Sequence, residues 1–131
     1  MEELLRFTPA AFERRIAAAW RGFTRPAAAG AVRILDGSFF QIPVGVMLAM
    51  NAPPARIRAL VRRLDALLAG ANGALVYLHR PDTRRALAGT GDIRGMRWLE
   101  ELTAALARSP YGRARRVRNL NGLVGYYERQ R

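Results

Sequence analysis

Two short runs of apolar residues constrain the fold of this chain more than any other feature. Ala31–Leu35 precedes an Asp-Gly pair, and Ala74–Leu78 precedes the single histidine, His79. A continuous apolar run of this length, rather than an alternating one, is typical of a strand buried on both faces of a parallel sheet. We therefore predict two strands, near 31–35 and near 74–78.

The sequence between these runs has the pattern of helices. Pro43 begins an apolar stretch that continues to about Met50, and the Pro-Pro pair at 53–54 separates it from a longer amphipathic helix. The apolar stripe of that helix is Ile57, Leu60, Val61, Leu64, Leu67 and Leu68. Two strands joined by a helical crossover are parallel and the connection is right-handed. The expected fold class is therefore α/β.

Helical patterns also flank the two runs. We expect a helix from Thr8-Pro9 to near Gly22, a short helix from Asp82 or Thr83 to Gly89, and a loop over 90–95. A further helix contains Trp98 and stops at Ser109-Pro110, a basic loop covers 111–118, and a last helix covers 120–127. Because two strands make an incomplete sheet, residues 1–131 are interpreted as a single partial α/β domain.

The residue types exclude several classes of function. The chain has 131 residues with no cysteine and one histidine, so it has no disulfide, no thiolate nucleophile and no set of residues for a zinc site. Its first residues are acidic, and its longest apolar run, Phe39–Ala49, is too short to cross a bilayer. We therefore expect a cytoplasmic protein with no membrane partner.

The charge of the chain comes entirely from arginine. The formal net charge is +12, and all 22 lysine-or-arginine positions are arginine. Arginine is always protonated and binds phosphate and carboxylate well, but lysine chemistry is excluded. The densest cluster contains Arg108, Arg113, Arg115, Arg116 and Arg118, with no acidic residue between them. Compositional bias explains this cluster as a solvated loop; the alternative is contact with a nucleic-acid backbone.

Several segments resemble a family of P-loop nucleotide-kinase-like proteins with a thymidylate-kinase-like fold. They are the strand ending Ile34-Leu-Asp-Gly37 followed by Phe39–Val44, the run Leu75–Leu78 followed by Arg80-Pro-Asp82, Arg94-Gly95 with Trp98, and Ser109–Gly112. The resemblance covers roughly 20–128. Members of such folds carry a Gly-rich loop ending in Gly-Lys-Ser/Thr, which this chain lacks. The resemblance therefore implies the middle and C-terminal portion of an incomplete three-layer kinase-like domain, inactive alone.

The resemblance also implies roles for individual residues. Asp36 would orient the phosphoryl acceptor or a metal ion, and Arg94 and Arg97 would stabilise charge within a lid-like region near 90–118. The substrate-binding residues would be Gln41, Arg113, Arg115 and Arg116. No cofactor is expected for this chain alone, and no residue is assigned as a metal ligand. ATP and Mg²⁺ would need an N-terminal half that carries the P-loop.

Simpler interpretations of the same residues stay open. Asp36 is also a good turn residue, Gln41 is a polar residue at a helix entry, and Arg94 fits ordinary helix capping. Three functions remain: a kinase-like phosphotransferase if completed, a basic interaction module that binds nucleic acid or another anionic partner, and a chain that completes its sheet by pairing with another chain.

Overall fold

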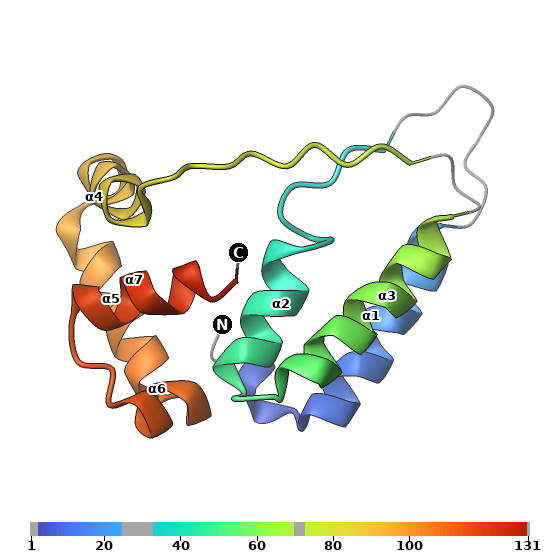
Figure 1. The fold of residues 1–131 in the computed structure, drawn as a ribbon, viewed down its shortest axis with the longest axis horizontal. Helices are drawn as coiled ribbons and strands as arrows, with labels where there is room; N and C mark the ends of the chain where they lie inside the picture. Colours follow the sequence, from blue (N-terminus) through green and yellow to red (C-terminus); the bar gives the residue numbers. More distant parts are fainter. Residues whose placement is uncertain (1–2, 25–32, 70–72, 131) are drawn as a thin grey trace.

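Helices form all the regular secondary structure in the part of the chain that the structure describes. The structure, a computed structural model, describes residues 3–24, 33–69 and 73–130. These ranges contain seven α-helices and one short 3-10 helix (Figure 1). The elements are η1 (Leu4–Arg6), α1 (Pro9–Phe23), α2 (Gln41–Ala49), α3 (Pro54–Leu68), α4 (Thr83–Arg94), α5 (Met96–Arg108), α6 (Pro110–Arg115) and α7 (Leu120–Glu128).

The prediction of an α/β fold with two parallel strands is wrong. The described residues contain no strand, and Ala74–Leu78 is extended but joins no ladder. Of the other predicted strand, 31–32 lie outside the described residues, and Arg33–Leu35 has no strand pairing. Both segments are exposed, with Ile34 90% and Leu78 88% accessible. An apolar run shows that a segment suits a sheet, but hydrogen-bonding partners decide whether a sheet forms.

The resemblance to P-loop kinase-like proteins is also wrong. A three-layer kinase-like domain is built around a parallel sheet, whereas the described part of this chain is helical. The Gly-Lys-Ser/Thr loop cannot be formed by a chain without lysine. The chain is therefore neither P-loop NTPase-like nor kinase-like in its described residues.

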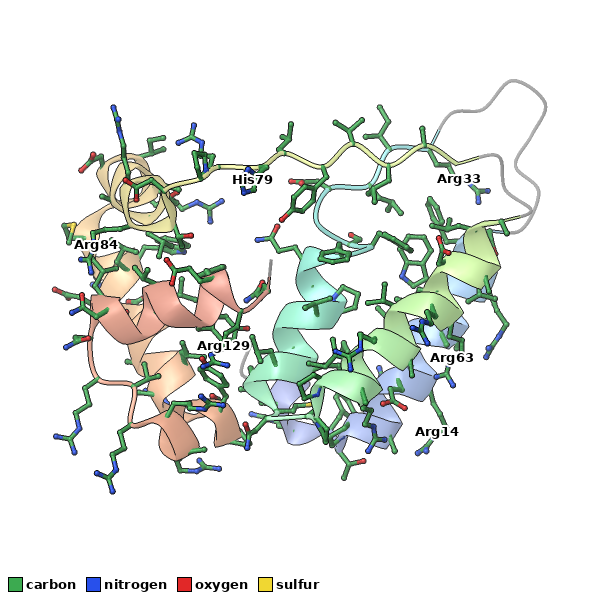
Figure 2. All side chains as sticks on the ribbon, in the orientation of Figure 1. Arg14, Arg33, Arg63, His79, Arg84 and Arg129 are labelled. Carbon is green, nitrogen blue, oxygen red and sulfur yellow. The ribbon has the colours of Figure 1, made fainter. Side chains whose placement is uncertain are left out.

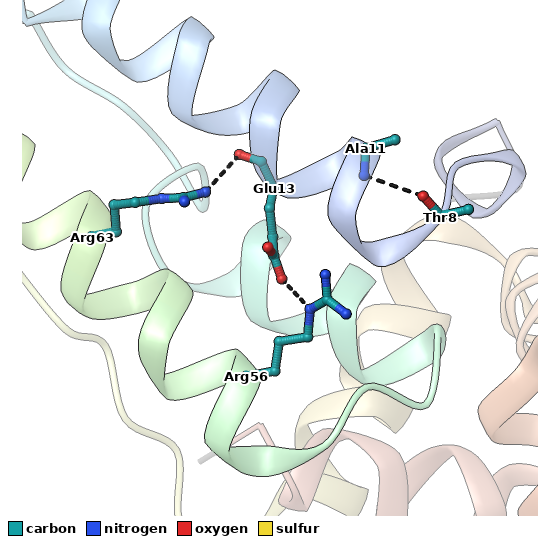
Figure 3. Close-up of polar contacts among 5 residues, drawn as sticks. All are labelled: Thr8, Ala11, Glu13, Arg56 and Arg63. Carbon is teal, nitrogen blue, oxygen red and sulfur yellow. Dashed lines mark hydrogen bonds and ion pairs between the residues drawn. The ribbon is translucent and has the colours of Figure 1, made fainter.

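The N-terminal half is built on the predicted amphipathic helices. The Thr8 hydroxyl accepts a hydrogen bond from the Ala11 amide at 3.2 Å and caps α1, with Pro9 as the first helical residue (Figure 3). α1 and α3 lie side by side (Figure 1). Their apolar faces form one core with α2, made by Phe12, Trp20, Val46, Met47, Met50, Ala52, Leu60 and Leu64.

A polar contact also joins α1 to α3. Arg56 Nε donates to Glu13 Oε1 at 2.5 Å, and Arg63 donates to the backbone carbonyl of Glu13 at 3.3 Å (Figure 3). The hydrogen bond to Glu13 raises the pKa of Arg56. These two contacts tie α1 to α3 beside their shared core, the Arg56–Glu13 pair being partly buried.

α2 joins the two halves of the molecule. Met47 is fully buried in the N-terminal core, while Ala49 belongs to the C-terminal core. The hydroxyl of Tyr126 in α7 donates to the carbonyl oxygen of Gly45 at 2.7 Å in a buried position. α2 ends where Asn51 adopts a left-handed conformation with φ 56°, a common way to close a helix. The predicted helix from Pro43 to about Met50 is confirmed as an element, but it begins earlier, at Gln41, and ends at Ala49.

The C-terminal half is helical over more residues than predicted. The Asp82 carboxylate accepts from the Arg85 amide at 2.9 Å and caps α4, which continues past Gly89 to Arg94. The predicted loop over 90–95 is therefore mostly helix, although Gly89 and Gly91 each cost the helix about 1 kcal/mol. Within 111–118, expected to be a loop, the first part is α6. No helix in the described ranges is long and apolar enough to span a membrane.

Candidate functional site

A cleft of about 620 Å³ lies between the extended segment after α3 and the helices of the C-terminal half. Its walls come from the loop before α2, from residues 75–80, from α4, and from the end of α7. Figure 1 shows residues 73–82 as one extended segment that runs from the α3 side of the molecule to α4. The cleft is therefore bounded by the ends of the two runs that we expected to be strands, at Leu35 and Asp36 and at residues 75–80.

Three of the predicted site residues line this cleft: Asp36, Gln41 and Arg94. Asp36 lies in a turn that Gly37 closes, with φ 63° at Gly37 and a hydrogen bond from the Ile42 amide to the Gly37 carbonyl at 2.9 Å. Gln41 is the first residue of α2, and its side chain packs over Gly37. The turn conformation of Asp36 and the helix-entry position of Gln41 match the simpler interpretations of both residues.

Arg94 and Arg97, predicted to act together, have different surroundings. Arg94 is in the last turn of α4, and its guanidinium lies 5.2 Å from the ring centre of Trp98. Such cation–π contact holds the charge at the cleft wall. Arg97 instead pairs with Glu101 at 2.9 Å, both side chains being exposed, and it does not line the cleft. Only Arg94 is placed to contact a molecule in the cleft.

Aromatic residues form a wall of the cleft that sequence reasoning missed. Tyr77 meets Phe40 edge-on with ring centres 6.1 Å apart, and His79 stacks on Tyr77 at 6.3 Å. Trp98 and Tyr127 also line the cleft. Figure 2 shows His79 on the extended segment. These rings come from four separate parts of the chain, and no spacing in the sequence connects them.

The described residues provide no metal centre. No group of three or more His, Cys, Asp or Glu side chains in those ranges is arranged to hold a metal ion. Asp36 is the only carboxylate among the described residues that line the cleft. The cleft is therefore aromatic and apolar, with cationic groups at Arg80 and Arg94.

The second candidate site is the basic turn, which we define as Arg113, Arg115, Arg116 and Arg118. Its backbone is held by two buried residues, Ser109 at the N-cap of α6 and Gly112 within α6. The Ser109 hydroxyl donates to the Leu106 carbonyl at 2.6 Å and accepts from the Gly112 amide at 3.0 Å. Gly112 is required there, since a Cβ atom would lie 1.9 Å from the Leu106 carbonyl oxygen. The backbone of the basic turn is thereby fixed against α5.

Arg116 has an uncommon conformation for its residue type. Its φ is 52°, in the left-handed region, at the position that closes α6. The Arg116 amide donates to the Arg113 carbonyl at 3.3 Å and the Val117 amide to the Gly112 carbonyl at 2.9 Å. This pair of hydrogen bonds forms a Schellman motif, in which glycine is the usual left-handed residue. Buried Val117 anchors the chain directly after it.

The arginine side chains of the basic turn point to solvent. All four are exposed, and no acidic residue occurs in the sequence from 109 to 127. The Arg115 guanidinium lies 5.7 Å from the ring centre of Tyr111, and Arg113 donates to the backbone carbonyl of Arg108. None of the four lines the cleft, so Arg113, Arg115 and Arg116 form a site separate from Asp36, Gln41 and Arg94.

Comparison with known proteins does not place this chain in a family. No protein-family model, curated protein or solved structure matches it.

Proposed function

We propose that this chain binds nucleic acid through the sugar-phosphate backbone, with the basic turn as its contact surface. The observation that carries the proposal is the left-handed Arg116 between exposed arginines on a fixed turn. Unfavourable backbone conformations are often found at functional sites, where the side chain that they place is needed. Glycine would close α6 at lower energetic cost but would supply no charge.

The arrangement of the four arginines suits phosphate recognition. The basic turn carries four guanidinium groups within six residues. Its backbone is held in place by Ser109, Gly112 and Val117, so the backbone loses little conformational entropy when the arginines bind a ligand. A guanidinium donates two parallel hydrogen bonds to a phosphate. The overall charge of +12 attracts a polyanion from a distance.

The residues around the basic turn favour contact with the sugar-phosphate backbone of the nucleic acid over contact with its bases. The one aromatic residue within the cluster, Tyr111, is only 3% exposed, so it offers no surface for base stacking. We therefore expect similar affinity for unrelated oligonucleotide sequences and a strong dependence on salt, because arginine–phosphate contacts release counterions.

The test compares two triple variants with the same change of charge. The first replaces Arg113, Arg115 and Arg116 with glutamine. The control replaces Arg14, Arg58 and Arg62, which are also exposed but lie on α1 and α3. Affinity for a fluorescent oligonucleotide is measured by anisotropy over a range of salt concentrations.

We expect the slope of log K against log salt to become shallower by up to about 0.9 for each lost contact with double-stranded DNA. That change should occur in the basic-turn variant and be much smaller in the control. Figure 2 shows Arg14, one of the control residues, on the side of the molecule away from α6, whose place Figure 1 gives in the same orientation. Equal losses in both variants would mean that binding follows net charge alone, and would refute the proposed site.

A further inference from the structure

The extended segment Ala74–Leu78 exposes apolar side chains on both of its faces. Successive side chains of an extended chain point in opposite directions. Leu75 is 62%, Val76 79%, Tyr77 55% and Leu78 88% accessible, so neither face is covered. Burying one such side chain fully is worth about 1.5–3 kcal/mol. A contiguous apolar patch of this kind marks an interaction site.

The backbone of the same segment has no hydrogen-bonding partner among the residues that the structure describes. Within the described ranges, the amide and carbonyl groups of Ala74–Leu78 make no hydrogen bond. An extended chain with free donors and acceptors is a template for an added strand. The residue types, with valine and tyrosine among leucines, also suit a strand.

We propose that Ala74–Leu78 pairs with an extended, acidic segment of another protein, which enters the cleft and adds to it as a β-strand. This inference is independent of the proposed nucleic-acid binding, because the cleft and the basic turn share no residue. The main-chain hydrogen bonds supply affinity, and the cleft walls select the side chains.

The cleft itself identifies the chemistry of the occupant. Its volume of about 620 Å³ is bounded by the exposed segment on one side and by Phe40 and Trp98 among its other walls, so apolar side chains of the added strand would be covered. Arg80 and Arg94 lie at the cleft and supply its positive charge. An apolar centre with a charged rim is the usual composition of a protein interface. Carboxylates flanking the apolar residues of the partner would meet these arginines.

Charge also argues against a second copy of this chain as the occupant. Each copy carries a formal charge of +12, so two copies repel each other as their segments approach. An acidic partner instead gains attraction at the same contact and associates faster.

The test uses a synthetic peptide of alternating valine and threonine with two glutamates at each end, and a control peptide with lysines in place of the glutamates. Binding to the full chain is measured by fluorescence anisotropy, and hydrogen exchange follows the amides of 74–78. We expect saturable binding of the acidic peptide, at least roughly tenfold weaker binding of the lysine peptide, and slower exchange of alternate amides in 74–78.

Proline substitutions test the strand pairing. In an extended chain, alternate amides point to opposite edges. Val76→Pro removes an amide on one edge and Tyr77→Pro an amide on the other; neither amide is hydrogen-bonded within the described residues. We expect one of the two variants to bind the peptide roughly tenfold more weakly, by the loss of a ladder hydrogen bond and the clash of the ring. The other should retain most of its affinity.

Several results would overturn the inference. They are equal affinity for both peptides, equal loss in both proline variants, unchanged exchange at 74–78, or a stable dimer of the chain alone in sedimentation. The glutamine variant of Arg113, Arg115 and Arg116 is expected to bind the peptide like the unaltered chain. Failure of the peptide experiment and failure of nucleic-acid binding are therefore distinguishable.

Discussion

Replacing Arg116 with glycine separates the energetic cost of the basic turn from its function. A left-handed conformation costs an L-residue about 1–2 kcal/mol, and glycine adopts it without that cost. Glycine also increases the conformational entropy of the unfolded chain, which lowers the free energy of unfolding by about 0.4–1 kcal/mol and offsets part of this gain in stability. The two Schellman hydrogen bonds use backbone atoms only and are retained. We expect Arg116→Gly to raise the free energy of unfolding by roughly 0.5–1 kcal/mol.

The assay follows the fluorescence of Trp20 and Trp98 during urea denaturation. Both tryptophans contact the cores, so their emission reports global unfolding. The stability of the variant should increase while its oligonucleotide affinity falls, since one phosphate-binding side chain is gone. Arg115→Gly is the matched control: it removes the same charge from within α6, where glycine lowers stability by up to about 1 kcal/mol.

Two results for Arg116→Gly would contradict these expectations. If Arg116→Gly destabilised the protein as much as Arg115→Gly does, the left-handed conformation would not be costly and would be no sign of function. If Arg116→Gly were more stable but bound oligonucleotide with unchanged affinity and salt slope, the strained residue would have no part in binding.

Three further changes test the fold around both sites. Gly112→Ala should lower stability by about 3 kcal/mol or more, because the new Cβ would lie 1.9 Å from the Leu106 carbonyl oxygen; an unchanged denaturation midpoint would contradict this. Tyr126→Phe should cost about 1 kcal/mol through loss of the 2.7 Å hydrogen bond to Gly45, and an equally stable variant would show that the bond does not hold α7 to α2. Burial raises the pKa of Tyr126 and Tyr127, so their protons are held in the folded state at a pH where the unfolded chain releases them. Stability should therefore fall above about pH 10, by up to about 1.4 kcal/mol per pH unit for each tyrosine, and the fall should be smaller in Tyr126→Phe; a pH-independent midpoint from 9 to 12 would exclude this linkage.

The helices with clear ends were predictable from the sequence. Thr8 caps α1, and Pro9 and Pro54 are the first residues of α1 and α3. A capping hydroxyl and a proline at the first position act locally and need no tertiary partner. The extent of α4 was not predictable in the same way. Gly89 is a typical end signal, yet contacts of α4 with α5 and α7 offset the cost of two glycines, Gly89 and Gly91, inside the helix.

The two strands were predicted wrongly for a physical reason. Ala74–Leu78 has the composition of a buried strand, and its extended conformation agrees with that composition. A strand, however, is defined by hydrogen bonds to a neighbour, and a sequence does not state whether its neighbour is on the same chain. The resemblance to kinase-like proteins depended in part on the same two strands, and it is wrong because the described residues form no sheet.

Part of each candidate site could be predicted from the sequence. The basic turn is continuous in the chain, so its residues could be named directly, whereas its rigidity depends on Ser109, Gly112 and Val117 in the folded structure. The cleft brings Asp36 and Arg94 together from distant segments. Its aromatic wall depends on tertiary contacts that no local pattern encodes.

The most direct test of the proposed function is an NMR titration of the chain with a short oligonucleotide, observed at the Nε–H groups of its arginines. If the basic turn binds the oligonucleotide, we expect the signals of its four arginines, Arg113, Arg115, Arg116 and Arg118, to shift first and most. The signals of Arg14, Arg58 and Arg62 should stay nearly unchanged at moderate salt. Uniform shifts over all arginines, or shifts confined to α1 and α3, would contradict this expectation.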